Sequence, residues 1–228
     1  MQYGEKFYGR IKTRSLSVRQ ENLYKTLMSE IGIKSYKEAD TSSFQRIFLE
    51  IGFGSGEHIA YMAMNNPKDL FIGCEPFVNG VASLLVKIEE NGINNIRIYQ
   101  ADARIMMKEV PSNSLAGVFL LFPDPWAKRK HIKRRFLQNE TIDSIWGKLK
   151  IGGFWRIASD HEAYKAWMLR LFSQDQIRDR FDVKTFNKES RPDITNWAQT
   201  RYEQKATGDI LYMECVKKRS SDEINQET

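Results

Sequence analysis

The sequence predicts an α/β fold with a doubly wound, mostly parallel sheet. From Arg46 onward, short apolar runs that suit β-strands alternate with stretches of helical periodicity, a pattern typical of βαβ units. A glycine-rich turn follows the first of these runs. The chain has 228 residues, of which 41% are hydrophobic and 28% charged, so it can bury one substantial core and we expect a single α/β domain.

The alternating pattern predicts seven strands and six helices. Turn residues separate the apolar runs, and the helical stretches between them are long enough for parallel crossovers. The expected strands span residues 47–51, 70–75, 96–100, 117–122, 153–158, 181–186 and 210–217. The expected helices span residues 18–31, 57–64, 78–91, 103–110, 136–149 and 161–172.

Flanking segments surround the expected domain. Residues 1–45 are mixed and partly basic, which predicts an arm with a docking helix, and the sequence leaves open whether this arm contacts RNA. Residues 46–217 form the α/β domain, and residues 218–228 form a polar tail.

The positive charge is concentrated in one place. The net charge is +6, and six of the eight residues from Lys128 to Arg135 are Lys or Arg with no acid among them. A cluster of this kind favours a polyanionic partner. The sequence has no signal-peptide core and no apolar run near the ~20 residues of a membrane helix. We therefore expect a cytoplasmic protein without a membrane partner.

The two cysteines, Cys74 and Cys215, lie far apart in apolar contexts. Their spacing fits neither a disulfide framework nor a zinc site. We expect two buried free thiols and no metal.

The first expected strand leads into the glycine-rich turn. In LEIGFGSGEH, Glu50 precedes Gly52, Gly54 and Gly56, and the next helix follows. Such a turn lets a ligand approach the backbone and directs helix N-terminal amides at it, although an ordinary tight turn would look similar. A dinucleotide fingerprint would need a further glycine where Glu57 stands, so NAD is disfavoured.

Two acids follow at the ends of the next two expected strands. Glu75 can accept both hydroxyls of a ribose, because open α/β sheets bind ligands beyond their strand ends. Asp102 can accept from the exocyclic amine of an adenine or can cap the following helix, and both roles stay open. Together with the glycine turn, these acids resemble the class I S-adenosylmethionine-dependent methyltransferases. That resemblance implies a Rossmann-like fold with the last of seven strands antiparallel, and S-adenosyl-L-methionine as cofactor.

The fourth expected strand is followed directly by Pro123-Asp124-Pro125-Trp126. The prolines restrict the backbone around Asp124 and fix its carboxylate. A carboxylate can accept from guanine N1 and the exocyclic amine, which leaves N7 free to face a methyl donor. A rigid turn with a helix-capping Asp is the alternative. The place resembles the Asn/Asp-Pro-Pro-aromatic site of class I enzymes that modify nitrogens, with another proline order.

The basic run follows that acid directly. Its position favours contact with RNA phosphates over a merely solvated loop. Within it, His131 suits a hydrogen-bond donor better than a metal ligand or catalytic base, because no partner stands at useful spacing. Trp126 suits either base stacking or core packing.

The sequence resembles the bacterial tRNA (guanine-N7-)-methyltransferase family, which modifies a guanine in the tRNA variable loop, in LEIGFGSGEH, GCEPF, ADA, FPDPWAKRKHIKRR, ASDH and TRYEQKA. The resemblance covers residues 46–217. It implies Asp124 at the catalytic centre. The cofactor residues are Glu50, Gly52, Gly54, Gly56, Glu75, Asp102 and Asp124. The substrate residues are Lys128, Asp160, Thr200, Arg201, Tyr202 and Glu203. The RNA-contacting residues are Lys130, His131, Ile132, Lys133, Arg134 and Arg135.

Some points depart from this pattern or stay open. Arg201 stands where family members commonly have Lys, and a guanidinium donates differently from an ammonium. Asp160 can also cap the helix near His161. The alternatives in function are a methyltransferase for a small molecule or protein, and a non-catalytic RNA-binding protein on this scaffold.

Overall fold

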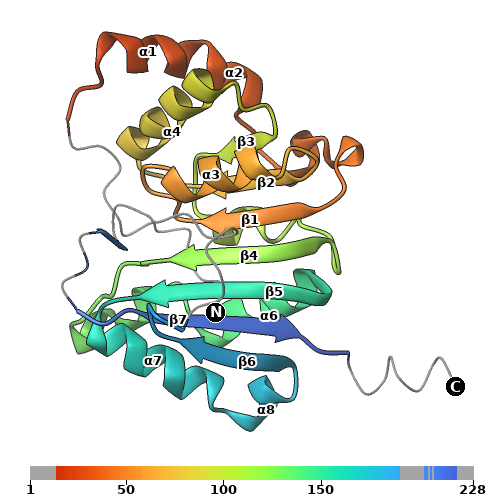
Figure 1. The fold of residues 1–228 in the computed structure, drawn as a ribbon, viewed down its shortest axis with the longest axis vertical. Coiled ribbons are helices and arrows are strands. Elements are labelled where there is room, and N and C mark those ends of the chain that lie inside the picture. Colours follow the sequence, from red (N-terminus) through yellow and green to blue (C-terminus); the bar gives the residue numbers. More distant parts are fainter. Residues whose placement is uncertain (1–13, 191–202, 205, 207, 220–228) are drawn as a thin grey trace, which may run out of the picture. The chain divides into compact units, whose positions relative to one another are not determined.

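The computed structural model describes residues 14–190, 203, 204, 206 and 208–219 (Figure 1). The described chain divides into two compact units, one up to Val110 and one from Pro111 onward. The predicted boundaries at 1–45, 46–217 and 218–228 stay predictions.

The first unit is built on three parallel strands. They are β1 (Ile47–Ile51), β2 (Leu70–Cys74) and β3 (Ile96–Tyr99), in the order β3-β2-β1. Nearly every residue of these strands is buried, as expected for parallel strands covered on both faces. The carboxyl ends of β1 and β2 are aligned, since Ile51 pairs with Cys74.

The helices of the first unit cover these strands. The long helices are α3 (Glu57–Asn65) and α4 (Val78–Asn91), and α1 (Val18–Lys25) packs beside α4 (Figure 1). Arg19 of α1 bonds to Glu89 and Glu90 of α4. The short helices are α2 (Leu27–Ile31), α5 (Ala103–Met106) and the 3₁₀ turns η1 (Tyr36–Ala39) and η2 (Thr41–Ser43).

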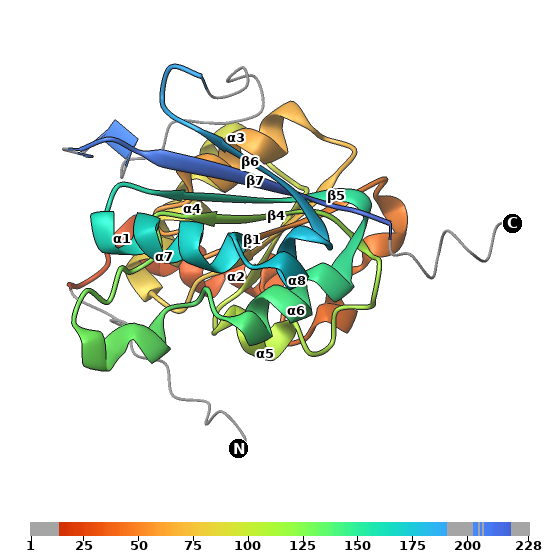
Figure 2. The ribbon, with the colours of Figure 1, turned by 90° about the horizontal axis from the view of Figure 1, so that it is seen from below.

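The second unit has four strands and a layer of helices. The strands are β4 (Leu115–Leu121), β5 (Leu149–Ser159), β6 (Phe181–Phe186) and β7 (Leu211–Lys217), in the order β4-β5-β7-β6. β4 and β5 are parallel, and β7 runs antiparallel to both β5 and β6. In Figure 2, α6 (Asn139–Lys148), α7 (Glu162–Phe172) and α8 (Asp175–Arg178) lie on one face of these strands.

The seven predicted strands are confirmed, and so is the antiparallel last strand. The expected helix at 18–31 is broken at Thr26 into α1 and α2, and the one at 103–110 ends at Met106. The helix expected from residue 136 begins at Asn139, where the Gln138 N–H donates to the Thr141 side-chain oxygen at 3.0 Å. The basic run contains a 3₁₀ helix, η3 (Arg129–Arg134).

Both cysteines are free and buried, as predicted. Burial raises the pKa of the Cys74 and Cys215 thiols well above the ordinary value. Among the described residues, no group of three or more His, Cys, Asp or Glu side chains could hold a metal ion. No described helix has the length and apolar character needed to cross a membrane.

Candidate functional site

The glycine turn after β1 requires its glycines. Gly52, Gly54 and Gly56 have φ angles of +70°, +56° and +77°, in the left-handed region that other residues adopt only with strain. A Cβ added to Gly52 would meet no atom within 4 Å, so the space beside the turn is open. Gly56 is the N-cap residue of α3, and no side chain of a described residue caps this helix. The turn therefore has the form of a cradle in which a ligand can approach the backbone.

The turn is also packed closely against α4. A Cβ on Gly80 would stand 2.3 Å from the Gly54 carbonyl oxygen, so only glycine fits at this position. Lys87, seven residues after Gly80 in α4, donates from Nζ to the Ser55 carbonyl at 2.9 Å. These contacts hold the shape of the cradle.

The Glu75 carboxylate is fixed directly beside the glycine turn. Its Oε2 accepts from the Gly54 N–H at 2.8 Å, and its Oε1 accepts from the Phe77 N–H at 2.9 Å. The residue is 9% exposed. Each oxygen can accept a further hydrogen bond, so this carboxylate can receive two neighbouring hydroxyls.

Two other acids of the first unit have side-chain partners to which the sequence analysis assigned no role. Asp102 caps α5 by accepting from the Arg104 N–H, and the Arg104 guanidinium bonds to it through Nε at 2.9 Å and Nη2 at 2.5 Å. The capping role that the sequence left open is therefore present. Glu50 is buried, and its Oε2 lies 2.7 Å from Nδ1 of the buried His58 on α3.

In the second unit, Asp124 is exposed on a strained turn that directly follows β4. The residues that bracket the Pro-Asp-Pro sequence, Phe122 and Trp126, have φ angles of +52° and +40°. Such left-handed conformations cost about 1–3 kcal/mol each outside glycine. The Phe122 N–H donates to the Ala158 carbonyl at 2.8 Å and ties the start of the turn to β5. The predicted rigid turn is present.

The basic run continues from this turn. The side chains of Lys128, Arg129, Lys130 and Lys133 are exposed, and none forms an ion pair with a described residue. Four exposed cations without neighbouring acids create a positive surface that favours a polyanion.

The aromatic rings of this segment pack against its own residues. The rings of Trp126 and His131 meet edge to face at 5.7 Å, and the Arg134 guanidinium lies 5.0 Å from the Trp126 ring centre. Desolvation, together with the charges of Arg134, Lys130 and Lys128, lowers the pKa of His131, so its imidazole is neutral at pH 7. Ile132 is half-buried, and its carbonyl accepts from Gln138 at 2.8 Å.

Arg135 differs from the other cations of the run. It was expected to contact RNA, but it is only 3% exposed, and its guanidinium bonds to backbone carbonyls inside the unit. Its burial does not fit a phosphate contact in this structure. The charge pattern of the sequence gave no sign of this difference.

The predicted substrate residues are described only in part. Asp160 is half-buried after β5, and α7 is capped by the His161 side chain, which accepts from the Ala163 N–H, so the capping role considered for Asp160 is wrong. Glu203 is 3% exposed, and its Oε1 accepts from the Tyr212 hydroxyl at 2.7 Å. Thr200, Arg201 and Tyr202 lie outside the described residues.

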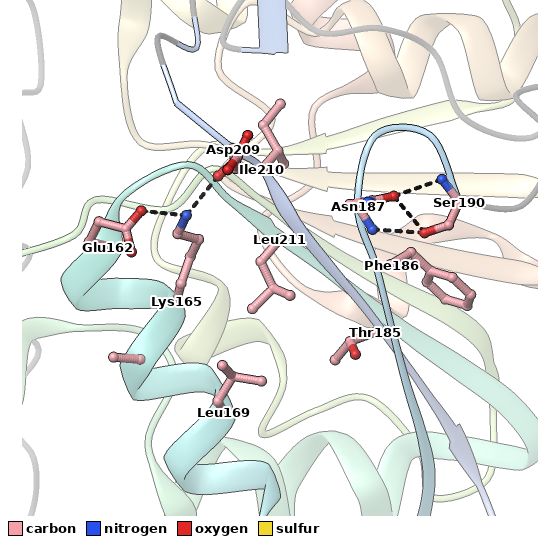
Figure 3. A pocket seen from close by; sticks show the side chains of 11 residues that line it. Glu162, Lys165, Leu169, Thr185, Phe186, Asn187, Ser190, Asp209, Ile210 and Leu211 are labelled. Carbon is pink, nitrogen blue, oxygen red and sulfur yellow. Dashed lines mark hydrogen bonds and ion pairs between the residues drawn. The ribbon is translucent and has the colours of Figure 1, made fainter.

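A cleft of about 620 Å³ lies elsewhere in the second unit, between α7 and the strands β6 and β7 (Figure 3). Lys165 crosses one side, bonding to the Asp209 carbonyl at 2.8 Å and to Glu162 at 2.6 Å. No predicted site residue lines this cleft. Its lining has no acid on a rigid turn and no cluster of unpaired cations. The Asp124 turn and the exposed cations are therefore the better candidates for a functional site.

Comparisons with known proteins agree with the chemistry of these residues. A family model described as "Putative methyltransferase" matches residues 44–209. The tRNA (guanine-N(7)-)-methyltransferase of Zymomonas mobilis is 38% identical over 205 residues, which are 88% of each chain. The enzyme of that name from Caulobacter vibrioides is 38% identical over 89% of each chain.

This chain belongs to the tRNA (guanine-N7-)-methyltransferase family. Solved structures resemble its fold at low sequence identity. A 16S rRNA (adenine(1408)-N(1))-methyltransferase from Catenulisporales acidiphilia has a TM-score of 0.55 at 14% identity, covering 92% of this chain and 99% of its own. The antibiotic-resistance methyltransferase Kmr has a TM-score of 0.56 at 14% identity, covering 81% and 92%. These likenesses show the class I, Rossmann-like methyltransferase fold.

In this member of the tRNA (guanine-N7-)-methyltransferase family, two residues to which sequence reasoning assigned no role contact predicted site residues. They are His58 and Arg104. They follow an acid by eight and two positions, so a basic residue close after an acid in or behind a strand is the signal that could have found them.

Proposed function

We propose that this protein transfers a methyl group from S-adenosyl-L-methionine to N7 of a guanine in the variable loop of tRNA. One observation carries the proposal beyond family membership: an exposed carboxylate on a rigid turn is followed directly by four exposed cations that have no acid partner among the described residues. The carboxylate can hold a base by hydrogen bonds, and the cations can hold the phosphates of the RNA backbone by charge.

The first unit would hold the cofactor. The open space beside Gly52 and the fixed Glu75 carboxylate suit a small ligand with a pair of neighbouring hydroxyls, and S-adenosylmethionine carries such a ribose. When bound, this cofactor supplies a methyl group already activated by its sulfonium. Asp102 would accept a hydrogen bond from the adenine amine in addition to those from Arg104. Glu50, which is bonded to His58, would be a further cofactor residue.

The role proposed for Asp124 is to orient the guanine and to complete the cofactor contacts. A carboxylate accepts two parallel hydrogen bonds, which matches the N1 and exocyclic N–H groups of guanine and directs N7 away from the acid. Guanine N7 has a free lone pair and no proton, so the reaction needs alignment and no general base. Alignment alone can supply several kcal/mol of a reaction barrier.

The remaining contacts, with the target nucleotide and with the tRNA backbone, would come from the second unit. Lys128, Asp160 and the segment from Thr200 to Glu203 are proposed to contact the target nucleotide. Lys130, His131, Lys133 and Arg134 are proposed to contact the tRNA backbone, with neutral His131 acting as a hydrogen-bond partner.

The test uses purified protein, methyl-labelled S-adenosylmethionine and two tRNA transcripts, one with guanosine and one with 7-deazaguanosine throughout. We expect label in the first transcript, recovered as 7-methylguanosine, and none in the second. A filter-binding assay checks that both transcripts bind. Label in another nucleoside, or transfer only to protein or small molecules, would refute the proposal.

A further inference from the structure

Arg135 is a buried cation without an acid partner among the described residues. Its side chain bonds to two carbonyl oxygens, through Nε to Pro125 at 2.8 Å and through Nη1 to Ala163 at 3.2 Å. Two rings of α7 flank the guanidinium, Tyr164 at 5.5 Å and Trp167 at 5.4 Å from its carbon. Burial lowers the pKa of Arg135, which reflects the cost of keeping the charge at this place.

One of those carbonyls belongs to the strained turn. Pro125 directly follows Asp124, and the turn is bracketed by Phe122 and Trp126 in left-handed conformations. Such conformations persist only where the surroundings hold them. The backbone bond from Phe122 to Ala158 holds the first end, and Arg135 holds the far end at Pro125.

The other carbonyl belongs to the start of α7. Ala163 lies in the first turn of this helix, three positions after Asp160. One planar guanidinium therefore reaches both the turn that carries Asp124 and the helix that follows Asp160. A lysine could not span both carbonyls in this way, because its ammonium is a point donor.

We propose that Arg135 is a positioning residue for methyl transfer, which holds the Asp124 turn against α7 through the Pro125 and Ala163 carbonyls and does not contact tRNA phosphates. This inference rests on the proposed function of Asp124. It separates Arg135 from the exposed cations of the same run, with which its sequence position groups it.

The test compares Arg135→Met and Arg135→Lys with Lys133→Ala, an exposed cation two positions earlier. In Arg135→Met we expect kcat at saturating tRNA to fall 10- to 100-fold, while the Kd for tRNA and its salt dependence stay within twofold. In Arg135→Lys the ammonium can keep one of the two carbonyl contacts, so this variant should recover part of kcat. Lys133→Ala should instead raise the Kd and reduce the salt dependence.

Two results would overturn this assignment. A loss of tRNA affinity and salt dependence in Arg135→Met with kcat unchanged would make Arg135 a phosphate contact, and no change in either quantity would remove its role. If Arg135→Met does not fold, the kcat and Kd of Arg135→Lys decide alone.

Hydrogen exchange of the backbone amides of Phe122, Asp124, Trp126 and Ala127 tests the clamp without any methyl transfer. We expect faster exchange in both Arg135 variants than in the wild type and in Lys133→Ala, and unchanged exchange would refute the clamp. A wild type that does not methylate tRNA would refute the proposed function and leave this exchange test valid.

Discussion

At the scale of single residues, two acids of the first unit depend on basic side chains to which the sequence analysis assigned no role. Glu50 is bonded to His58, and Asp102 is bonded to Arg104. Buried or half-buried carboxylates need such partners, because an unsatisfied charge is costly away from water. A motif identifies the acid from its place at a strand end, whereas its partner depends on how the next helix packs. Sequence reasoning could therefore predict the acids and missed the basic residues.

Asp124→Asn tests the proposed role of the acid. The amide places a donor where two acceptor oxygens are needed, so guanine can no longer bind in the same orientation. We expect kcat to fall by about 100-fold or more, because small misplacement of reacting groups has effects of this size. The Kd for tRNA should change little, since the exposed cations remain.

The matched control for this substitution is Asp182→Asn on β6, an exposed acid of the same unit. It should keep the wild-type kcat. Methyl transfer by Asp124→Asn at the wild-type rate would exclude Asp124 from the reaction.

Gly80→Ala tests the packing of the glycine turn. The new methyl group would stand 2.3 Å from the Gly54 carbonyl oxygen, so the turn or α4 must shift. Overpacking of this kind costs about 1–3 kcal/mol in the free energy of unfolding. We expect lower stability in chemical denaturation and weaker S-adenosylmethionine binding by calorimetry.

Gly147→Ala in α6 provides the comparison, because an added Cβ there meets nothing within 4 Å. Because alanine has a higher helix propensity than glycine, we expect this variant to keep the wild-type stability or to gain slightly. If both variants bound the cofactor like the wild type, the close fit of Gly80 would have no importance for the site.

At the scale of elements, apolar runs predicted the buried parallel strands well, because both faces of such strands are covered. Helix ends were predicted less well. The apolar pattern reports neither the break at Thr26 nor the local bond between Gln138 and Thr141 at the start of α6. The short helix η3 was expected as a loop, since a basic stretch has no apolar periodicity.

If the segment containing η3 contacts tRNA phosphates, removing its cations should change both the Kd for tRNA and its salt dependence. In the double variant Lys130→Ala and Lys133→Ala, two phosphate contacts are lost, so the Kd for tRNA should rise. The plot of the logarithm of the association constant against the logarithm of the salt concentration should also become less steep, by about 0.7–0.9 for each lost contact. Filter binding across a salt series measures both quantities.

Lys184→Ala on β6 removes an exposed cation of the same unit away from this segment and should bind tRNA like the wild type. Equal effects in the double variant and in Lys184→Ala would mean that general charge, and not η3, binds the RNA.

At the scale of the whole molecule, the order of motifs along the chain predicted the family, which the relatives confirm over 88% of the chain. The glycine turn alone is common to many nucleotide-binding proteins. The turn with Asp124 and the adjoining basic run made the prediction specific, because together they indicate a base and its phosphates. The contact of Arg135 with α7 joins residues 28 positions apart, and it depends on packing that sequence reasoning had no means to predict.

The most direct measurement is nucleoside analysis of tRNA from cells with and without this protein. The proposed function predicts that 7-methylguanosine in tRNA is lost when the protein is removed, and that it returns with the wild type but not with Asp124→Asn. An unchanged amount of 7-methylguanosine in tRNA after removal, in cells with no second such enzyme, would contradict it.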